Sequence, residues 1–121
     1  MRPELWAGVL IVGGLGSVAR FVVDRAVARR TRAALPFGTL AVNVSGAFLL
    51  GLLTGVAPGT TVALLAGTAF LGAYTTFSTW MLETDRLAEE RQIRTAAANI
   101  GVSLVCGLAA AFAGYLLGRL W

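Results

Sequence analysis

The sequence has few of the residues that build catalytic or metal sites. Among 121 residues there is no histidine, no lysine and a single cysteine. One cysteine excludes a disulfide framework and any cysteine-based zinc spacing, and Cys106 lies in an apolar run, where a small packing residue fits. No pair of acids lies inside an apolar run to replace these groups. We therefore expect that the protein is not an enzyme.

Charged residues are also scarce: 13% of the chain, against 57% hydrophobic residues and a mean hydropathy of +0.77. A soluble chain of this length has no core large enough to bury so much apolar surface. An isoelectric point near 10.6 taken alone would suit a nucleic-acid binder. However, seven of the ten arginines lie in two short segments between apolar runs, as in membrane loops: Arg25, Arg29, Arg30, Arg32, Arg86, Arg91 and Arg94. We expect a multi-pass protein of the cell membrane, surrounded by lipid, with no nucleic-acid partner.

Four apolar runs are long enough to span a bilayer, because about 20 helical residues at about 1.5 Å each cross a hydrocarbon core of about 30 Å. They cover residues 5–27, 38–56, 61–82 and 95–118. The turn composition of residues 57–60 predicts an antiparallel hairpin between the second and third runs. Alternating acids and bases after residue 82 predict a surface helical extension. The sequence thus predicts one all-α domain, residues 1–121, of four transmembrane helices.

Small residues are frequent in the predicted helices, and the chain has fifteen glycines. In lipid, small residues let helix backbones approach closely, so that dispersion contacts hold the helices together. This favours a compact bundle. Because one such chain leaves little room for an aqueous path along its centre, we expect a dimer as the working unit.

Two polar positions lie inside the first two runs. Arg20 is deep in the first run, where an unpaired charge costs roughly 2.5 to 3.5 kcal/mol on insertion scales. It attracts anions at a vestibule, or it snorkels towards the interface or bonds helix-end carbonyls. Asn43, with Thr39 one turn earlier, supplies neutral donors that could replace the water around an anion. The alternative is an interhelical hydrogen bond.

The third run contains the segment Gly72–Trp80, rich in threonine and aromatic residues and poorly suited to a helix interior. A local helix break there would expose backbone carbonyls able to hold a cation, whereas in an intact helix the hydroxyls would bond to the preceding turn. Phe77 and Trp80 share a helix face, and their positive ring edges could attract a small anion or simply pack. In the fourth run Asn99, Ser103 and Gly107 form a polar stripe, which could line a path or a helix contact.

These blocks together resemble the Fluc, or CrcB, family of fluoride channels. The matching blocks are residues 13–20, 36–46 and 72–79. The resemblance implies a passive, fluoride-selective channel that exports fluoride from the cytoplasm and lowers its toxicity. It also implies an antiparallel, dual-topology homodimer with two pores. A structural sodium ion would lie at the dimer interface, on the main-chain carbonyls of Gly72 and Thr75, where the third helix is broken mid-membrane.

The resemblance also implies roles for side chains. Asn43 would line the pore, Phe77 would give a ring edge to fluoride, Ser103 would belong to a polar track, and Arg20 matches the family's arginine in the first helix. Hydroxyls would complete a series of weak donors along the path, from Thr39, Thr76, Ser78 and Thr79. Two positions depart from the family pattern: Trp80 replaces a second phenylalanine, and Asn99 stands where a tyrosine can occur.

Two other classes of membrane protein compete with this interpretation. A small multidrug-resistance-type transporter also has four helices, but it needs a carboxylate deep in the membrane. Here Glu4 lies at the very start of the first run and Asp24 near its loop end, so the predicted spans have no central carboxylate. A membrane assembly subunit without transport would need only glycine-rich packing. The arginines raise a separate question. Seven follow the first and third spans and only Arg2 and Arg119 lie on the other side, which favours one orientation. A heterodimer with an oppositely oriented sister subunit is therefore the alternative to a homodimer.

Overall fold

The computed structural model describes residues 2–31 and 35–121, and every regular element in them is a helix. Arg32, one of the predicted loop arginines, lies outside the described residues. Four helical stretches are long and apolar enough to cross a membrane: Pro3–Arg30, Phe37–Val56, Thr60–Glu89 and Ile93–Gly118. The prediction of an all-α membrane protein with four spanning helices is confirmed.

The third stretch is divided into several elements. In chain order the helices are α1 (Pro3–Arg30), α2 (Phe37–Val56), α3 (Thr60–Val62), the π-helix η1 (Ala63–Leu71), α4 (Gly72–Tyr74), α5 (Ser78–Glu89) and α6 (Ile93–Gly118). Thus α1 runs three residues past the predicted limit at Val27, and α5 continues through the acid-and-base segment as far as Glu89.

Two tight turns reverse the chain, and each uses a non-glycine residue with positive φ. Ala57, at φ 54° and ψ 59°, ends α2, and its N–H donates to the carbonyl oxygen of Leu53 at 3.1 Å. Arg91, at φ 62°, follows α5, and the next amide, of Gln92, donates to the carbonyl of Leu87 at 2.8 Å. Left-handed residues of this kind satisfy carbonyls at helix ends.

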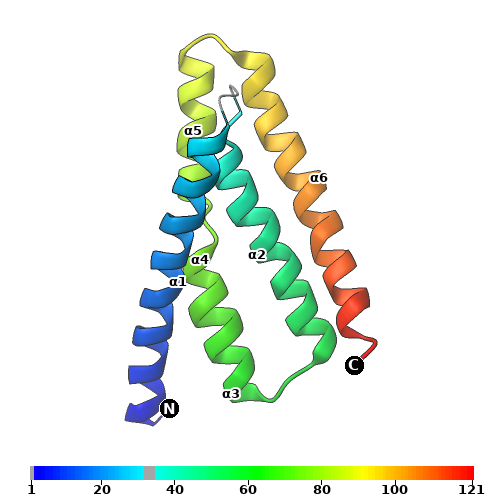
Figure 1. Ribbon diagram of the computed structural model, residues 1–121. Coiled ribbons are helices and arrows are strands. Elements are labelled where there is room, and N and C mark those ends of the chain that lie inside the picture. Colours follow the sequence, from blue (N-terminus) through cyan, green and yellow to red (C-terminus); the bar gives the residue numbers. More distant parts are fainter. Residues whose placement is uncertain (1, 32–34) are drawn as a thin grey trace.

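The chain crosses the bundle four times, so both termini lie at the same end, opposite the turn between α5 and α6 (Figure 1). The central helix is α2, which contacts α1 on one side and α6 on the other; α1 also packs along η1 and α4. Arg2 precedes α1 and Arg119 follows α6, so both lie at the end with the termini. Arg29 and Arg30 end α1 and Arg91 follows α5, so these three lie at the opposite end.

Glycines make the contact between α2 and α6 very close. A Cβ at Gly51 or Gly55 would collide with the backbone carbonyl of Ala111 or Tyr115 on α6. Conversely, a Cβ at Gly114 or Gly118 would collide with carbonyls on α2. Each helix therefore offers two glycines four residues apart, the small-residue spacing that lets helices pack without side chains between them.

Helix α1 and the third stretch pack around a small apolar core. Val42, Leu71 and Tyr74 are buried there, with Phe70 partly buried against them. Outside this core, large apolar side chains are exposed, among them Leu10 on α1 and Leu108 on α6, at 74% and 71%. Such surface is stable only against lipid or another subunit.

Candidate functional site

The candidate site is built around the three residues that separate α4 from α5. Thr75, Thr76 and Phe77 lie outside helices, and Thr75 has extended backbone, with φ −82° and ψ 160°. The amide and the hydroxyl of Thr75 both donate to the carbonyl of Leu71, at 3.0 and 2.9 Å. The hydroxyl thus bonds to the preceding turn, while the backbone after it leaves the helical path.

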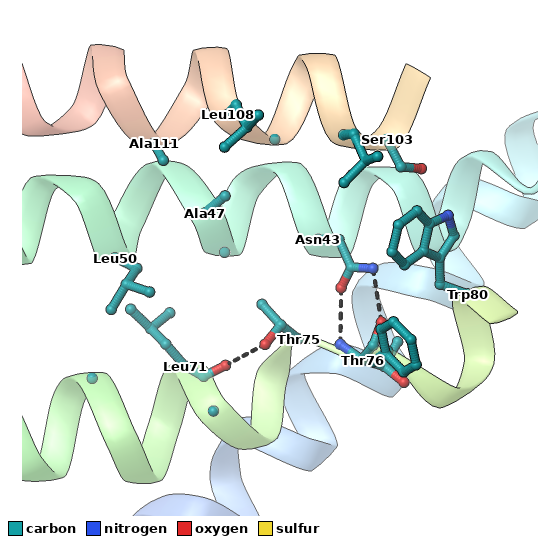
Figure 2. Close-up of a pocket in the computed structure, with 16 residues that line it drawn as sticks. Asn43, Ala47, Leu50, Leu71, Thr75, Thr76, Trp80, Ser103, Leu108 and Ala111 are labelled. Carbon is teal, nitrogen blue, oxygen red and sulfur yellow. Dashed lines mark hydrogen bonds between the residues drawn. The ribbon is translucent and has the colours of Figure 1, made fainter. Parts of the chain in front are cut away.

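The side chain of Asn43 on α2 holds the backbone of Thr76 through two hydrogen bonds (Figure 2). Its Nδ2 donates to the Thr76 carbonyl and its Oδ1 accepts the Thr76 N–H, both at 2.8 Å. A primary amide has both a donor and an acceptor, so one side chain can satisfy both groups of a peptide that no longer belongs to a helix.

This arrangement removes helical donors from carbonyls before and within the segment, among them those of Gly72 and Thr75. In a continuous helix the Gly72 carbonyl would accept the N–H of Thr76, but that N–H goes to Asn43. The Thr75 carbonyl would accept the N–H of Thr79, which instead goes to the hydroxyl of Thr76 at 3.2 Å. Within the described part of the chain, neither the Gly72 nor the Thr75 carbonyl accepts another hydrogen bond. Both oxygens are therefore available to a cation or a second subunit.

Next to the interruption between α4 and α5, at residues 75–77, lies an open groove of about 450 Å³, which we call the aromatic groove. α2 lies between its two sides, one formed by α6 and the other by η1, α4 and the segment as far as Trp80 (Figure 2). The structure brings eight of the residues singled out from the sequence to this groove: Asn43, Gly72, Thr75, Thr76, Phe77, Trp80, Ser103 and Gly107.

The two aromatic side chains of the groove pack edge to face. Their ring centroids are 5.8 Å apart and the ring planes meet at 83°. Phe77 is 70% exposed, so apart from its contact with Trp80 little of its ring is buried within one chain. An exposed ring next to free carbonyls and an amide is a group available to a ligand or a partner subunit.

A second, smaller cavity of about 240 Å³ lies on the α1 side of the interruption, and we call it the arginine cavity. Arg20 and Asp24 of α1, Thr39 of α2 and Thr79 of α5 contribute to its lining. Thr76 lines this cavity as well as the aromatic groove. The interrupted segment thus has Arg20 on one side and the aromatic pair on the other.

Comparisons with known proteins show the family of this chain. A family model described as "CrcB-like protein, Camphor Resistance (CrcB)" matches residues 7–115. The chain belongs to the CrcB family. The family resemblance drawn from the three sequence blocks is therefore confirmed.

Several curated relatives of this CrcB chain are similar over almost their whole length. A protein named fluoride-specific ion channel FluC 2 from Mycolicibacterium paratuberculosis is 66% identical over 96% of this chain and 95% of its own length. A protein of the same name from Mycobacterium tuberculosis (strain ATCC 25618 / H37Rv) is 60% identical, with 99% and 95% covered. Fluoride-specific ion channel FluC 1 from Geobacillus kaustophilus is 41% identical, with 92% and 95% covered.

Three candidate residues of the CrcB chain are not free to contact an ion in either cavity: two line neither cavity, and the hydroxyl of the third is hydrogen-bonded to an acid. Asn99 is 2% exposed and donates its amide to Thr84 of α5 at 2.9 Å, so it lies between helices and outside both cavities. Ser78 begins α5, is exposed and lines neither cavity. Thr39 lines the arginine cavity, but its hydroxyl donates to a carboxylate oxygen of Glu83 at 2.5 Å.

Sequence reasoning missed two residues that support this site in the CrcB chain. Glu83 looked like one of several loop acids, yet its carboxylate accepts the hydroxyl of Thr39, which is 3% exposed. Tyr74 is 6% exposed, and its hydroxyl lies 2.9 Å from the hydroxyl of Ser45 on α2. A buried tyrosine needs a partner for its hydroxyl, and that was the available signal for Tyr74.

Proposed function

We propose that this chain is the subunit of a passive, fluoride-selective ion channel, not an enzyme. The observation that carries the proposal is the pairing of Asn43 with Thr76 at a helix interruption, beside the exposed ring of Phe77. Support comes from family membership and from relatives named fluoride-specific ion channels. The channel would export fluoride from the cytoplasm across the cell membrane and lower its toxicity.

In this proposal the ion path begins in the arginine cavity. Arg20 attracts anions there without standing in the narrow part of the path, and a cation at the mouth raises the local anion concentration without trapping the ion. From the cavity the ion passes the hydroxyl of Thr79, which lines the cavity, and then that of Thr76, which lines both the cavity and the aromatic groove.

The path continues along the aromatic groove. There a dehydrated anion meets the second N–H of the Asn43 amide, the ring edges of Phe77 and Trp80, and the hydroxyl of Ser103. Each is a weak, neutral donor. A series of such donors replaces the hydration of a small anion and still lets it leave, whereas one strong cationic site would retain it.

The working unit in this proposal is an antiparallel homodimer. The aromatic groove is open along one side, so a single chain gives only part of a wall around an ion, and a second copy in the opposite orientation would close it. Exposed apolar side chains on α6, such as Val105 and Leu108, at 69% and 71%, would pack in that interface. Such a dimer has two equivalent paths in opposite directions.

The uneven distribution of the arginines between the two ends of the bundle favours the alternative assembly, a heterodimer. Because Arg29, Arg30 and Arg91 lie opposite the termini, insertion would prefer one orientation, and a sister subunit of opposite charge bias would then supply the antiparallel partner. Purification of the chain alone distinguishes the two assemblies. A homodimer conducts by itself and a heterodimer subunit does not.

The family also implies a structural sodium ion, and the residues present fit one. The Gly72 and Thr75 carbonyls have lost their helical donors. Gly72 lines the aromatic groove, and among the described residues a Cβ there would meet only the Gly67 carbonyl oxygen, at 3.9 Å, so there is room beside it. Carbonyl oxygens suit a hard monovalent cation. We propose that this interruption of the helix lies in the middle of the membrane. A bound sodium ion would there satisfy the backbone carbonyls that have no hydrogen-bond donor.

The test is fluoride efflux from liposomes that contain the purified chain alone, with chloride efflux as the control, both recorded with ion-selective electrodes. Fast fluoride loss without chloride loss is expected for the homodimeric channel. If folded protein alone shows no fluoride loss, but efflux appears after co-purification with a sister subunit, the assembly is the heterodimer and not the homodimer. Proton-coupled efflux of cationic drugs would favour a multidrug-type transporter, and no transport in any combination would leave an assembly subunit.

A further inference from the structure

Three residues form a closed ring of hydrogen bonds between α5 and α6. The indole Nε1–H of Trp80 donates to the backbone carbonyl of Asn99 at 3.2 Å. The side-chain amide of Asn99 donates to the hydroxyl of Thr84 at 2.9 Å, and that hydroxyl donates to the backbone carbonyl of Trp80 at 2.8 Å. Each residue donates once and accepts once, so the ring is complete without water.

The ring is shielded from solvent at Asn99, which is 2% exposed. In such an environment hydrogen bonds polarise one another, and loss of one member leaves its partners unsatisfied. The ring therefore fixes the orientation of the indole more firmly than the single 3.2 Å bond would by itself.

The orientation of the indole decides which part of Trp80 faces the aromatic groove. Tryptophan has one hydrogen-bond donor, the indole N–H, and here the backbone of α6 accepts it. The ring system meanwhile packs edge to face with Phe77 and lines the groove. Trp80 thus offers the groove only carbon edges and ring faces, as a phenylalanine would.

The difference matters for an anion path. An N–H pointed at a small anion makes a charge-assisted hydrogen bond, which is about twice as strong as a neutral one, whereas a C–H ring edge is a weak donor. A strong donor within the series would retain the ion.

We infer that Asn99 and Thr84 are positioning residues that turn the indole N–H of Trp80 out of the fluoride path, so that a tryptophan acts there as an aromatic wall. This inference rests on the proposed function. It also links the two departures from the family pattern. The indole N–H at position 80 bonds the backbone carbonyl at position 99, and the Asn99 side-chain amide completes the ring through Thr84.

The first test observes the indole without measuring transport. The chain has three tryptophans, and Trp6 and Trp121 are 56% and 90% exposed, so Trp6→Phe and Trp121→Phe together leave Trp80 as the single tryptophan, excited apart from the two tyrosines. In this protein fluoride meets only the ring edge, so the fluoride-specific change in emission should be small. Adding Thr84→Val should produce a clearly larger, saturable response to fluoride, with chloride as the control. A fluoride response of equal size with and without Thr84 overturns the inference.

The second test is a double-mutant comparison of fluoride efflux. Thr84→Val should slow efflux about tenfold, the effect of one additional hydrogen bond to a charged group of about 1.4 kcal/mol. Thr84→Ser should restore the rate. In the Trp80→Phe background, which has no indole N–H, Thr84→Val should have no effect. An equal slowing in both backgrounds would mean that Thr84 only holds the helices together, and the inference would be wrong.

A matched control is Thr54→Val. The hydroxyl of Thr54 also donates to a carbonyl four residues earlier, that of Leu50 at 2.8 Å, and within residues 2–31 and 35–121 it has no partner on another helix. This variant should conduct at the parent rate. If the parent itself does not conduct fluoride, the proposed function fails, while the emission test still reports whether the indole N–H is accessible.

Discussion

The side-chain amide of Asn43 on α2 forms two 2.8 Å hydrogen bonds with the backbone of Thr76, one as donor and one as acceptor. In effect the amide replaces the helical partners that Thr76 has lost. Asn43 is therefore both a groove residue and the support of the interrupted segment, so the two alternatives left open for it by the sequence, ion path and interhelical bond, are compatible.

Asn43→Asp tests this double role. The carboxylate can still accept the N–H of Thr76, but it cannot donate to the Thr76 carbonyl, and it places a negative charge beside the path. Fluoride efflux from liposomes should fall to background. The thermal midpoint in detergent should also drop, corresponding to about 1 to 3 kcal/mol for the unsatisfied carbonyl. An unchanged efflux rate would remove Asn43 from the path, and an unchanged midpoint would contradict its structural role.

Phe77→Ile tests the aromatic edge. The substitution keeps an apolar side chain but removes the positive ring edge, and because Phe77 is 70% exposed its loss should hardly affect the fold of the single chain. Fluoride efflux should fall by more than tenfold while size-exclusion elution stays the same. Phe112→Ile is the matched control, since Phe112 is 64% exposed on α6 and does not line the aromatic groove. Equal effects of the two substitutions would argue against a specific role for the Phe77 ring.

Gly114→Ala tests the contact between α2 and α6. A Cβ at Gly114 would collide with the backbone carbonyl of Phe48, so this substitution should destabilise the protein by about 1 to 3 kcal/mol, as overpacking does. At Gly101, also on α6, a Cβ would meet no atom within 4 Å, and the same substitution should stabilise the helix by up to about 1 kcal/mol. Thermal unfolding followed by circular dichroism measures both. Changes of the same sign would contradict the close packing described for Gly114.

Ala57→Gly tests the turn between α2 and α3. Ala57 is exposed and has φ 54°, a conformation that costs an L-residue roughly 1 to 2 kcal/mol and glycine much less. The thermal midpoint should rise. Ala109→Gly, at an exposed position within α6, is the opposite control and should lower it by about 1 kcal/mol. A lower midpoint for Ala57→Gly would mean that the left-handed turn is not strained.

The sequence alone was enough to predict the membrane location, the four spans and the family. These depend on composition, on runs of apolar residues and on blocks of residues near in sequence, all of which are local properties. The poor helix composition around Thr75 and Thr76 left both a break and an intact helix open, and the structure places residues 75–77 outside helices. Ser103 and Asn43 were also recognised as polar residues inside the spans, because such residues are rare there.

Only the tertiary structure decided which partner each polar side chain has. Asn99 and Ser103 lie four residues apart on α6, a rotation of about 40° beyond one full turn, so the sequence placed them on one stripe. The structure separates them: Ser103 lines the aromatic groove, whereas Asn99 meets Thr84 and Trp80 on α5. Likewise, Thr39 and Glu83 are 44 residues apart in the sequence and come together only in the fold. Periodicity fixes the direction in which a side chain points from its own helix, but the packing of the helices determines what it meets there.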